Sequence, residues 1–212
     1  MKELAARGER WARRNGRSPY AVMNHADICG LDVAGIAARD AVLLMWATYP
    51  KLEEAFEVIA AWGFEYKTVG FTWVKTNRNG LKIRLEHLQR VIKGIFSAAD
   101  SGDGAYVRLA GELVEGWHFG LGYHTRGNPE ICLLATRGRG LRRGGNGVQN
   151  LLVSALGEHS QKPDEVRERI IRLYGEVPRI ELFARQRSAG FEAWGNEAPG
   201  GSDVEIGVKP GD

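Results

Sequence analysis

Apolar residues recur along this chain in short runs that alternate with amphipathic segments. The continuous run at 41–47 (AVLLMWA) is typical of a strand buried in a parallel sheet. Pro50 then opens a predicted helix, and Gly63 ends it. Because 65–75 (EYKTVGFTWVK) has the pattern of a second strand, this part of the chain is predicted to form a strand–helix–strand unit.

The pattern returns in the second half of the chain. Strands are predicted at 131–136, 148–155 and 179–184, and a helix begins at Pro163 with two acidic residues in its first turn. Strands that alternate with helices predict an α/β fold, with a mainly parallel sheet covered by helices on both faces. In such sheets, ligands bind beyond the carboxyl ends of the strands.

Composition narrows the class of protein. The 212 residues are 43% hydrophobic and 26% charged, which is ordinary for one globular domain. No apolar stretch reaches the roughly 20 residues that a membrane helix needs, and the first residues have no secretory pattern. Cys29 and Cys132 lie far apart without metal-ligand spacing, so we expect reduced thiols in a cytoplasmic protein.

Positive charge is unevenly distributed. The formal net charge is only +3, but three segments are strongly basic: 1–17, 75–93 and 137–143 (RGRGLRR). Each of them alone is typical of a solvated face. Three basic segments on an otherwise acidic chain favour a nucleic-acid partner.

Two other motifs carry little information. The glycines at 138, 140 and 144 follow a predicted strand, but the third is misplaced for a dinucleotide-binding loop and a strand follows where a helix should. A flexible arginine-rich loop is the better interpretation. The five histidines have no metal-ligand spacing, so no metal site is predicted.

The C-terminal third contains three more specific motifs. They are His159–Asp164, Glu181–Arg185 and Trp194–Glu197, in that order around a predicted helix. Lys162 stands at the helix N-terminus, where an ammonium and backbone N–H groups suit a carboxylate. Glu197 follows a strand, where an acidic side chain can accept hydrogen bonds from ribose hydroxyls.

Together these motifs resemble the adenine-N6 methyltransferases of the type that writes N6-methyladenosine in messenger RNA, whose bacterial and phage relatives act on DNA. The resemblance covers about residues 18–197, with an insertion at about 78–117. Upstream it rests on Ser18–Met23, Leu44–Thr48, Ala61–Phe64, Phe71–Asn77 and Arg126–Glu130. We therefore expect a methyltransferase domain at 1–197 and a flexible tail at 198–212.

The resemblance implies a Rossmann-like methyltransferase fold, S-adenosylmethionine as cofactor, and transfer of a methyl group to the N6 amine of adenine. It favours DNA over RNA as the nucleic acid and implies a bacterial or phage origin. A methyltransferase subunit is a further candidate partner. The implied cofactor-binding residues are Lys162 for the carboxylate, Leu182, Phe183 and Arg185 lining the pocket, and Asn196 and Glu197 at the adenosine. The implied substrate-binding residues are Tyr20 at the target base, with Trp73, Lys75 and Asn77 near it.

One departure from the family pattern concerns the chemistry. The catalytic signature is Asp-Pro-Pro-Trp at the end of a strand, and no two of the seven prolines here are adjacent. Residues 1–40 also lack an apolar run for that first strand, so no catalytic residue is named. Two alternatives follow: a non-catalytic family member that binds nucleic acid as a partner of an active enzyme, or a truncated fragment.

Overall fold

The computed structural model describes residues 22–77, 89–90, 92–93, 117–120, 124–157 and 161–209. Tyr20 and most of the expected insertion lie outside the described residues. The chain divides into two compact units, which we describe separately. The first draws on Met1–Gly70, Cys132–Val148 and Arg167–Asp212, and the second on Phe71–Ile131 and Gln149–Val166.

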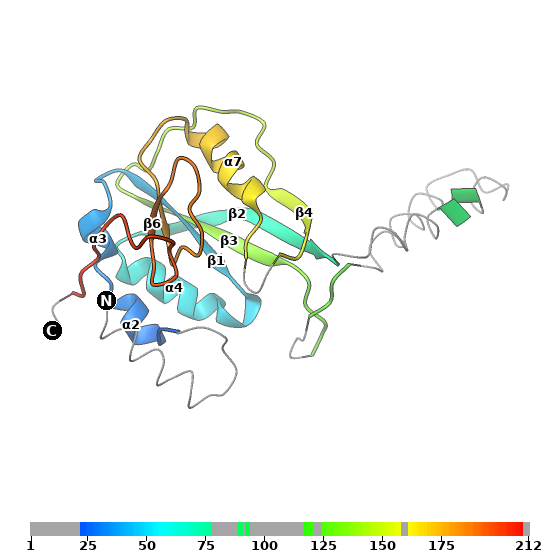
Figure 1. Ribbon diagram of the computed structural model, residues 1–212, viewed down its shortest axis with the longest axis horizontal. Helices are drawn as coiled ribbons and strands as arrows, with labels where there is room; N and C mark the ends of the chain where they lie inside the picture. Colours follow the sequence, from blue (N-terminus) through cyan, green and yellow to red (C-terminus); the bar gives the residue numbers. More distant parts are fainter. Residues whose placement is uncertain are drawn as a thin grey trace. The chain divides into compact units, whose positions relative to one another are not determined.

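Four strands form one sheet, in the order β1-β3-β2-β4 (Figure 1). They are β1 (Ala41–Ala47), β2 (Glu65–Thr76), β3 (Glu130–Arg137) and β4 (Leu151–Ala155). Two further strands, β5 (Ile180–Leu182) and β6 (Glu192–Trp194), form a separate parallel pair. β2 and β4 are also parallel, with Trp73 opposite Leu152.

The α/β prediction is therefore confirmed, and so are the strands predicted at 41–47, 65–75 and 131–136. The strands predicted at 148–155 and 179–184 are shorter than expected. The Rossmann-like arrangement, the helices on both faces and the domain boundaries at 1–197 and 198–212 stay predictions.

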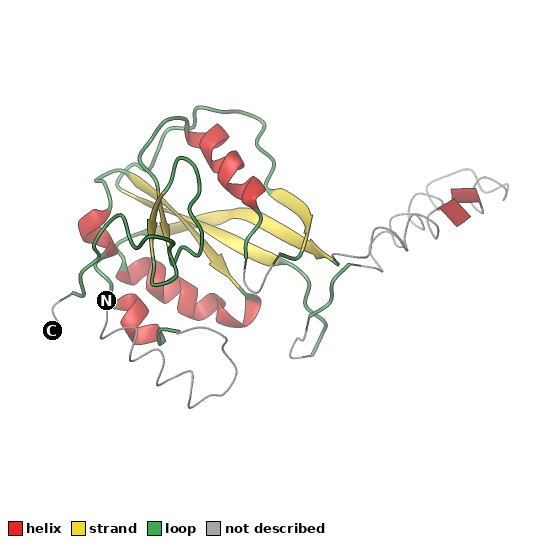
Figure 2. Ribbon diagram, viewed as in Figure 1, coloured by secondary structure: helices red, strands yellow, loops and turns green. Residues whose placement is uncertain are grey.

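Helix α4 (Leu52–Ala61) follows the short 3₁₀ helix η1 (Tyr49–Lys51), which contains Pro50. In the chain α4, drawn in red in Figure 2, comes between strands β1 and β2. Its buried face is formed by Ala55, Val58 and Ile59. Gly63, with φ of +78°, ends this segment as predicted.

In the described part of the chain before β1 lie two short helices, which were not predicted because they have too few residues for a periodic pattern. Asn24 caps α2 (His25–Cys29) by accepting a hydrogen bond from Asp27 N at 2.8 Å. Asp32 caps α3 (Val33–Ile36) in the same way. In the core of the first unit, a hydrogen bond joins α4 to α2: the indole Nε1 of Trp62, the residue directly after α4, donates to Ile28 O of α2 at 2.8 Å.

The segment after Ala198, where a flexible tail is predicted, makes specific contacts in its described part. Both carboxylate oxygens of Asp203 accept hydrogen bonds from Arg187, at 2.8 and 2.7 Å. Lys209 N donates to Gly30 O at 2.8 Å, and Ile206 is buried. Polar and glycine-rich composition did not reveal these contacts because they depend on chain segments far away in sequence.

The last helix, α7 (Asp164–Tyr174), begins directly after Pro163 as predicted and buries Val166. In the part of the chain that the structure describes, no helix is both long and apolar enough to cross a membrane.

Candidate functional site

The predicted substrate-side residues that the structure describes, Trp73, Lys75 and Asn77, lie at or directly after the end of β2. Phe71 and Trp73 are each only 2% exposed and share one face of the strand, on which Lys75 follows. The Trp73 indole Nε1 donates to Ser154 O of β4 at 3.3 Å. The Lys75 ammonium lies 5.9 Å from the centre of the Trp73 ring, within reach of a cation–π interaction. The buried indole therefore helps to hold the Lys75 ammonium in position.

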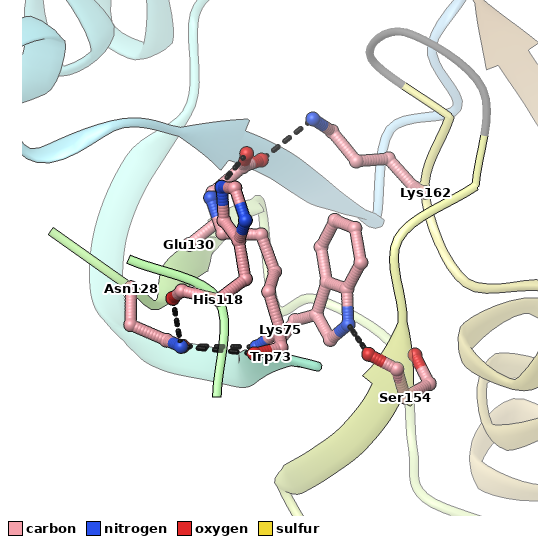
Figure 3. Close-up of polar contacts among 7 residues, drawn as sticks. All are labelled: Trp73, Lys75, His118, Asn128, Glu130, Ser154 and Lys162. Carbon is pink, nitrogen blue, oxygen red and sulfur yellow. Dashed lines mark hydrogen bonds and ion pairs between the residues drawn. The ribbon is translucent and has the colours of Figure 1, made fainter. Parts of the chain in front are cut away.

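Asn128 holds the end of β2 in place (Figure 3). Its Oδ1 accepts from Lys75 N at 2.9 Å, and its Nδ2 donates to Lys75 O at 2.9 Å and to His118 O. The side-chain amide thus pairs with the backbone of Lys75 as a neighbouring strand would. His118 adds a backbone bond to Lys75 O at 2.9 Å. Its Nδ1 is 3.3 Å from Oδ1 of the exposed Asn77, which makes Nδ1 the donor.

The first residue of β3, Glu130, joins two lysines that are far apart in the sequence (Figure 3). Its Oε1 is 3.3 Å from the Lys75 Nζ, and its Oε2 is 2.6 Å from the Lys162 Nζ. The side chains are 15% exposed for Glu130 and Lys75 and 26% for Lys162. Burial tends to raise the pKa of Glu130, but the ammonium and hydrogen bond of Lys162, followed by those of Lys75, hold that pKa below its usual range. Glu130 is therefore ionised at neutral pH.

The remaining predicted cofactor residues belong to the first unit, around β5 and β6. Leu182 ends β5, and Phe183 follows with φ of +58°, a left-handed conformation that is unusual for a residue other than glycine. Phe183 is 42% exposed, and its ring packs edge-on against Trp194, with centroids 5.3 Å apart. The turn therefore presents an aromatic surface directly after the carboxyl end of a parallel strand.

Close backbone packing follows at the end of β6. A Cβ on Gly195 would lie 2.9 Å from both the N and the O of Ala184, so only glycine fits there. Asn196 and Glu197 come next and are exposed. Arg185 Nε donates to Glu197 Oε2 at 2.8 Å, so these two predicted residues are brought together. The pairing orients the carboxylate at the surface of this turn.

The arginine-rich loop at 137–143 is less free than its sequence indicates. Arg137 Nη1 donates to two backbone carbonyls, Ala34 O within α3 at 2.6 Å and Ala37 O at the C-cap of α3 at 3.3 Å. Arg139 pairs with Asp40, and a backbone hydrogen bond from Arg139 lowers the pKa of that carboxyl. Arg137 thus stabilises the fold, while Arg142 and Arg143 are exposed.

The structure brings Trp73, Lys75, Asn77 and Lys162 into the second unit and the other described candidates into the first. Sequence reasoning did not select His118, Asn128 or Glu130 as site residues. For Asn128 and Glu130, two signals were present: Arg126–Glu130 is one of the segments that resemble the family, and it lies directly before a predicted strand. Among the described residues, no group of three or more His, Cys, Asp or Glu side chains could hold a metal ion.

Curated proteins similar to this chain are methyltransferases by name. The type II methyltransferase M.MunI of a Mycoplasma species is 29% identical over 181 residues, which cover 85% of this chain and 60% of that protein. An N(6)-adenosine-methyltransferase MT-A70-like protein of Arabidopsis thaliana is 25% identical over 193 residues, 90% of this chain and 23% of that protein. The N(6)-adenosine-methyltransferase subunit METTL3 of Danio rerio is 26% identical over 169 residues, 79% of this chain and 23% of that protein.

The chain therefore spans at most 60% of the length of these relatives. The sequence model of one family, MT-A70, matches residues 7–95 and 112–197. These two segments make up most of the chain and include every described candidate residue. The chain belongs to the MT-A70 methyltransferase family.

Proposed function

We propose that this chain is an S-adenosylmethionine-dependent methyltransferase domain for the N6 amine of adenine in DNA. Family membership supports the reaction class. The observation that supports the site is the cluster of Lys75, Glu130 and Lys162, because one carboxylate joins a predicted substrate residue to a predicted cofactor residue, and both lysine side chains are largely buried.

The residues present fit the cofactor chemically. S-adenosylmethionine has a carboxylate, ribose hydroxyls and an adenine ring, and it supplies an electrophilic methyl group on a sulfonium. An ammonium such as that of Lys162 suits the carboxylate. Glu197 is exposed and oriented by Arg185, and its carboxylate is suited to accept hydrogen bonds from the ribose hydroxyls. Leu182, the exposed ring of Phe183 and the amide of Asn196 suit an adenosine.

The target side is proposed at the end of β2. Lys75 and Asn77 present a cation and an amide there, and Asn128 fixes the backbone that carries them. Trp73 is too deeply buried to stack openly on a base, so its proposed role is to support Lys75. Tyr20 lies outside the described residues, and its contact with the target base remains part of the proposal. A base in duplex DNA has to be flipped out to be reached.

Activation of the amine is the part of the chemistry for which these 212 residues offer no family motif. The lone pair of the N6 amine is delocalised into the ring, so acceptors for its two hydrogens raise its nucleophilicity. In the family these acceptors come from Asp-Pro-Pro-Trp, which does not occur in the sequence. That difference favours a second candidate function, a non-catalytic member that binds nucleic acid beside an active methyltransferase.

Cofactor binding tests the proposed cofactor, and methyl transfer tests whether this chain by itself activates the adenine amine; both are measured on the same preparation. Calorimetry with S-adenosylmethionine is expected to show weak binding, and no binding would contradict the proposed cofactor. Transfer of labelled methyl to adenine-containing DNA or RNA by the 212-residue chain is expected to be undetectable. Detectable transfer would rule out the non-catalytic candidate and assign amine activation to another carboxylate. Filter binding to matched DNA and RNA strands tests the expected preference for DNA.

A further inference from the structure

The charged groups of Lys75, Glu130 and Lys162 form one cluster. Each carboxylate oxygen of Glu130 is engaged by a different lysine, Oε1 by Lys75 and Oε2 by Lys162. Two ammonium groups and one carboxylate have a formal net charge of +1. A largely buried cluster of this charge suits the approach of one further anion.

The two lysines do not act independently in such a cluster. Charges a few ångströms apart interact more strongly where water is partly excluded, and all three side chains are largely buried. If one ammonium moves away from Glu130, the carboxylate is compensated by the other alone. The remaining lysine is then held more strongly and attracts a second anion less.

We propose that Glu130 is a positioning residue that couples Lys75 to Lys162, so that an anion on one lysine lowers the affinity of the other for an anion. This inference rests on the proposed function, which assigns Lys162 to the cofactor carboxylate and Lys75 to the nucleic-acid side. Thermodynamic linkage makes the coupling reciprocal. A phosphate or other anion at Lys75 therefore weakens cofactor binding, and the bound cofactor weakens the hold of Lys75 on an anion.

The first test compares the affinity of four proteins for S-adenosylhomocysteine by calorimetry: wild type, Lys75→Met, Glu130→Gln and the double variant. Lys75→Met leaves a neutral cluster, so we expect the affinity to fall by about fivefold or more. Adding Glu130→Gln restores a net positive cluster, and most of the affinity should return. A purely structural role of Glu130 would make the double variant worse than either single variant, which overturns the proposal.

Lys67→Met supplies the control, because Lys67 pairs with Glu65 on an exposed part of β2 and should leave the affinity unchanged. An equal effect of Lys75→Met with and without Glu130 also overturns the coupling.

The second test needs no cofactor. Urea unfolding is measured for Lys75→Met, Lys162→Met and their combination, in the wild-type and Glu130→Gln backgrounds. With Glu130 present, losing both lysines should destabilise by more than the two single losses together, because the buried carboxylate then has neither ammonium. In the Glu130→Gln background the carboxylate is absent, so the effects of the two lysine substitutions should be additive. A cooperative unfolding transition in each variant shows that the compared proteins are folded.

The two tests fail separately. If the wild-type chain binds no S-adenosylhomocysteine, the proposed function fails, and the unfolding series still decides the coupling. Additive losses in both backgrounds overturn the inference and leave the proposed function standing.

Discussion

The carboxylate of Glu130 lies 2.6 Å from the ammonium of Lys162, although the two residues are 32 positions apart in the chain. Glu130 is the first residue of β3, and Lys162 stands two residues before α7. The same carboxylate reaches Lys75 at the end of β2. One acidic side chain, to which the sequence assigned no role, thus connects the two lysines on which the proposed cofactor and substrate sites depend.

Replacing Lys162 with Ala should weaken S-adenosylmethionine binding. The loss of a charged hydrogen bond to the cofactor carboxylate is expected to cost about 1–3 kcal/mol. Calorimetry measures the change, and Lys51→Ala is the matched control, because Lys51 pairs with Glu54 on an exposed turn. Unchanged affinity in Lys162→Ala would remove this residue from the site.

Glu130 should make the stability of the protein depend on pH in the acidic range. Its pKa is below the usual range when folded, so the stabilisation is complete above the unfolded-state pKa, about 4.3, and is lost as the pH falls through the folded value. Urea unfolding of wild type and Glu130→Gln should therefore differ most near neutral pH and converge in acid. A difference that stays constant from neutral pH into this acidic range would refute the assignment, and the exposed Glu176→Gln is the control.

The arginine-rich loop should contribute to nucleic-acid affinity through Arg142 and Arg143 and not through Arg137. Removing one phosphate-binding cation reduces the slope of log affinity against log salt on duplex DNA by about 0.9, so the double alanine variant should lose up to about 1.8. Filter binding across a salt series measures the slope. Arg137→Ala should instead lower the free energy of unfolding, because Arg137 donates to Ala34 O and Ala37 O. An unchanged slope in the double variant would make 75–93 the better candidate surface.

Gly195→Ala should destabilise the first unit. The new Cβ would lie 2.9 Å from backbone atoms of Ala184, which cannot move aside as a flexible side chain could. Overpacking of this kind costs about 1–3 kcal/mol. Gly207→Ala is the matched control, because nothing lies within 4 Å of its added Cβ. Equal unfolding midpoints for the two variants would contradict the close approach between the turns after β5 and β6.

The elements near the site could be predicted from local patterns. The run at 41–47 predicted β1, Pro50 and Gly63 bounded the helical segment, and Pro163 predicted the start of α7. These features depend on side-chain periodicity, a fixed proline φ and the positive φ open to glycine, all of which are properties of short segments. The motifs around Lys162, Arg185 and Glu197 likewise indicated the family, because their order is written in the sequence.

The pairing of charges was decided only by the tertiary structure. A long segment of chain separates β2 from β3, and its residues do not say that the two strands will be neighbours. The sheet order β1-β3-β2-β4 places β3 beside β2, and this brings Glu130 to Lys75. The sequence also did not predict how the segment after Ala198 packs, or that Arg137 holds α3, because both depend on contacts between distant parts of the chain. Strand order and long-range contacts come from the burial of the whole chain, so no local pattern of residues specifies which distant charge a lysine or arginine will meet.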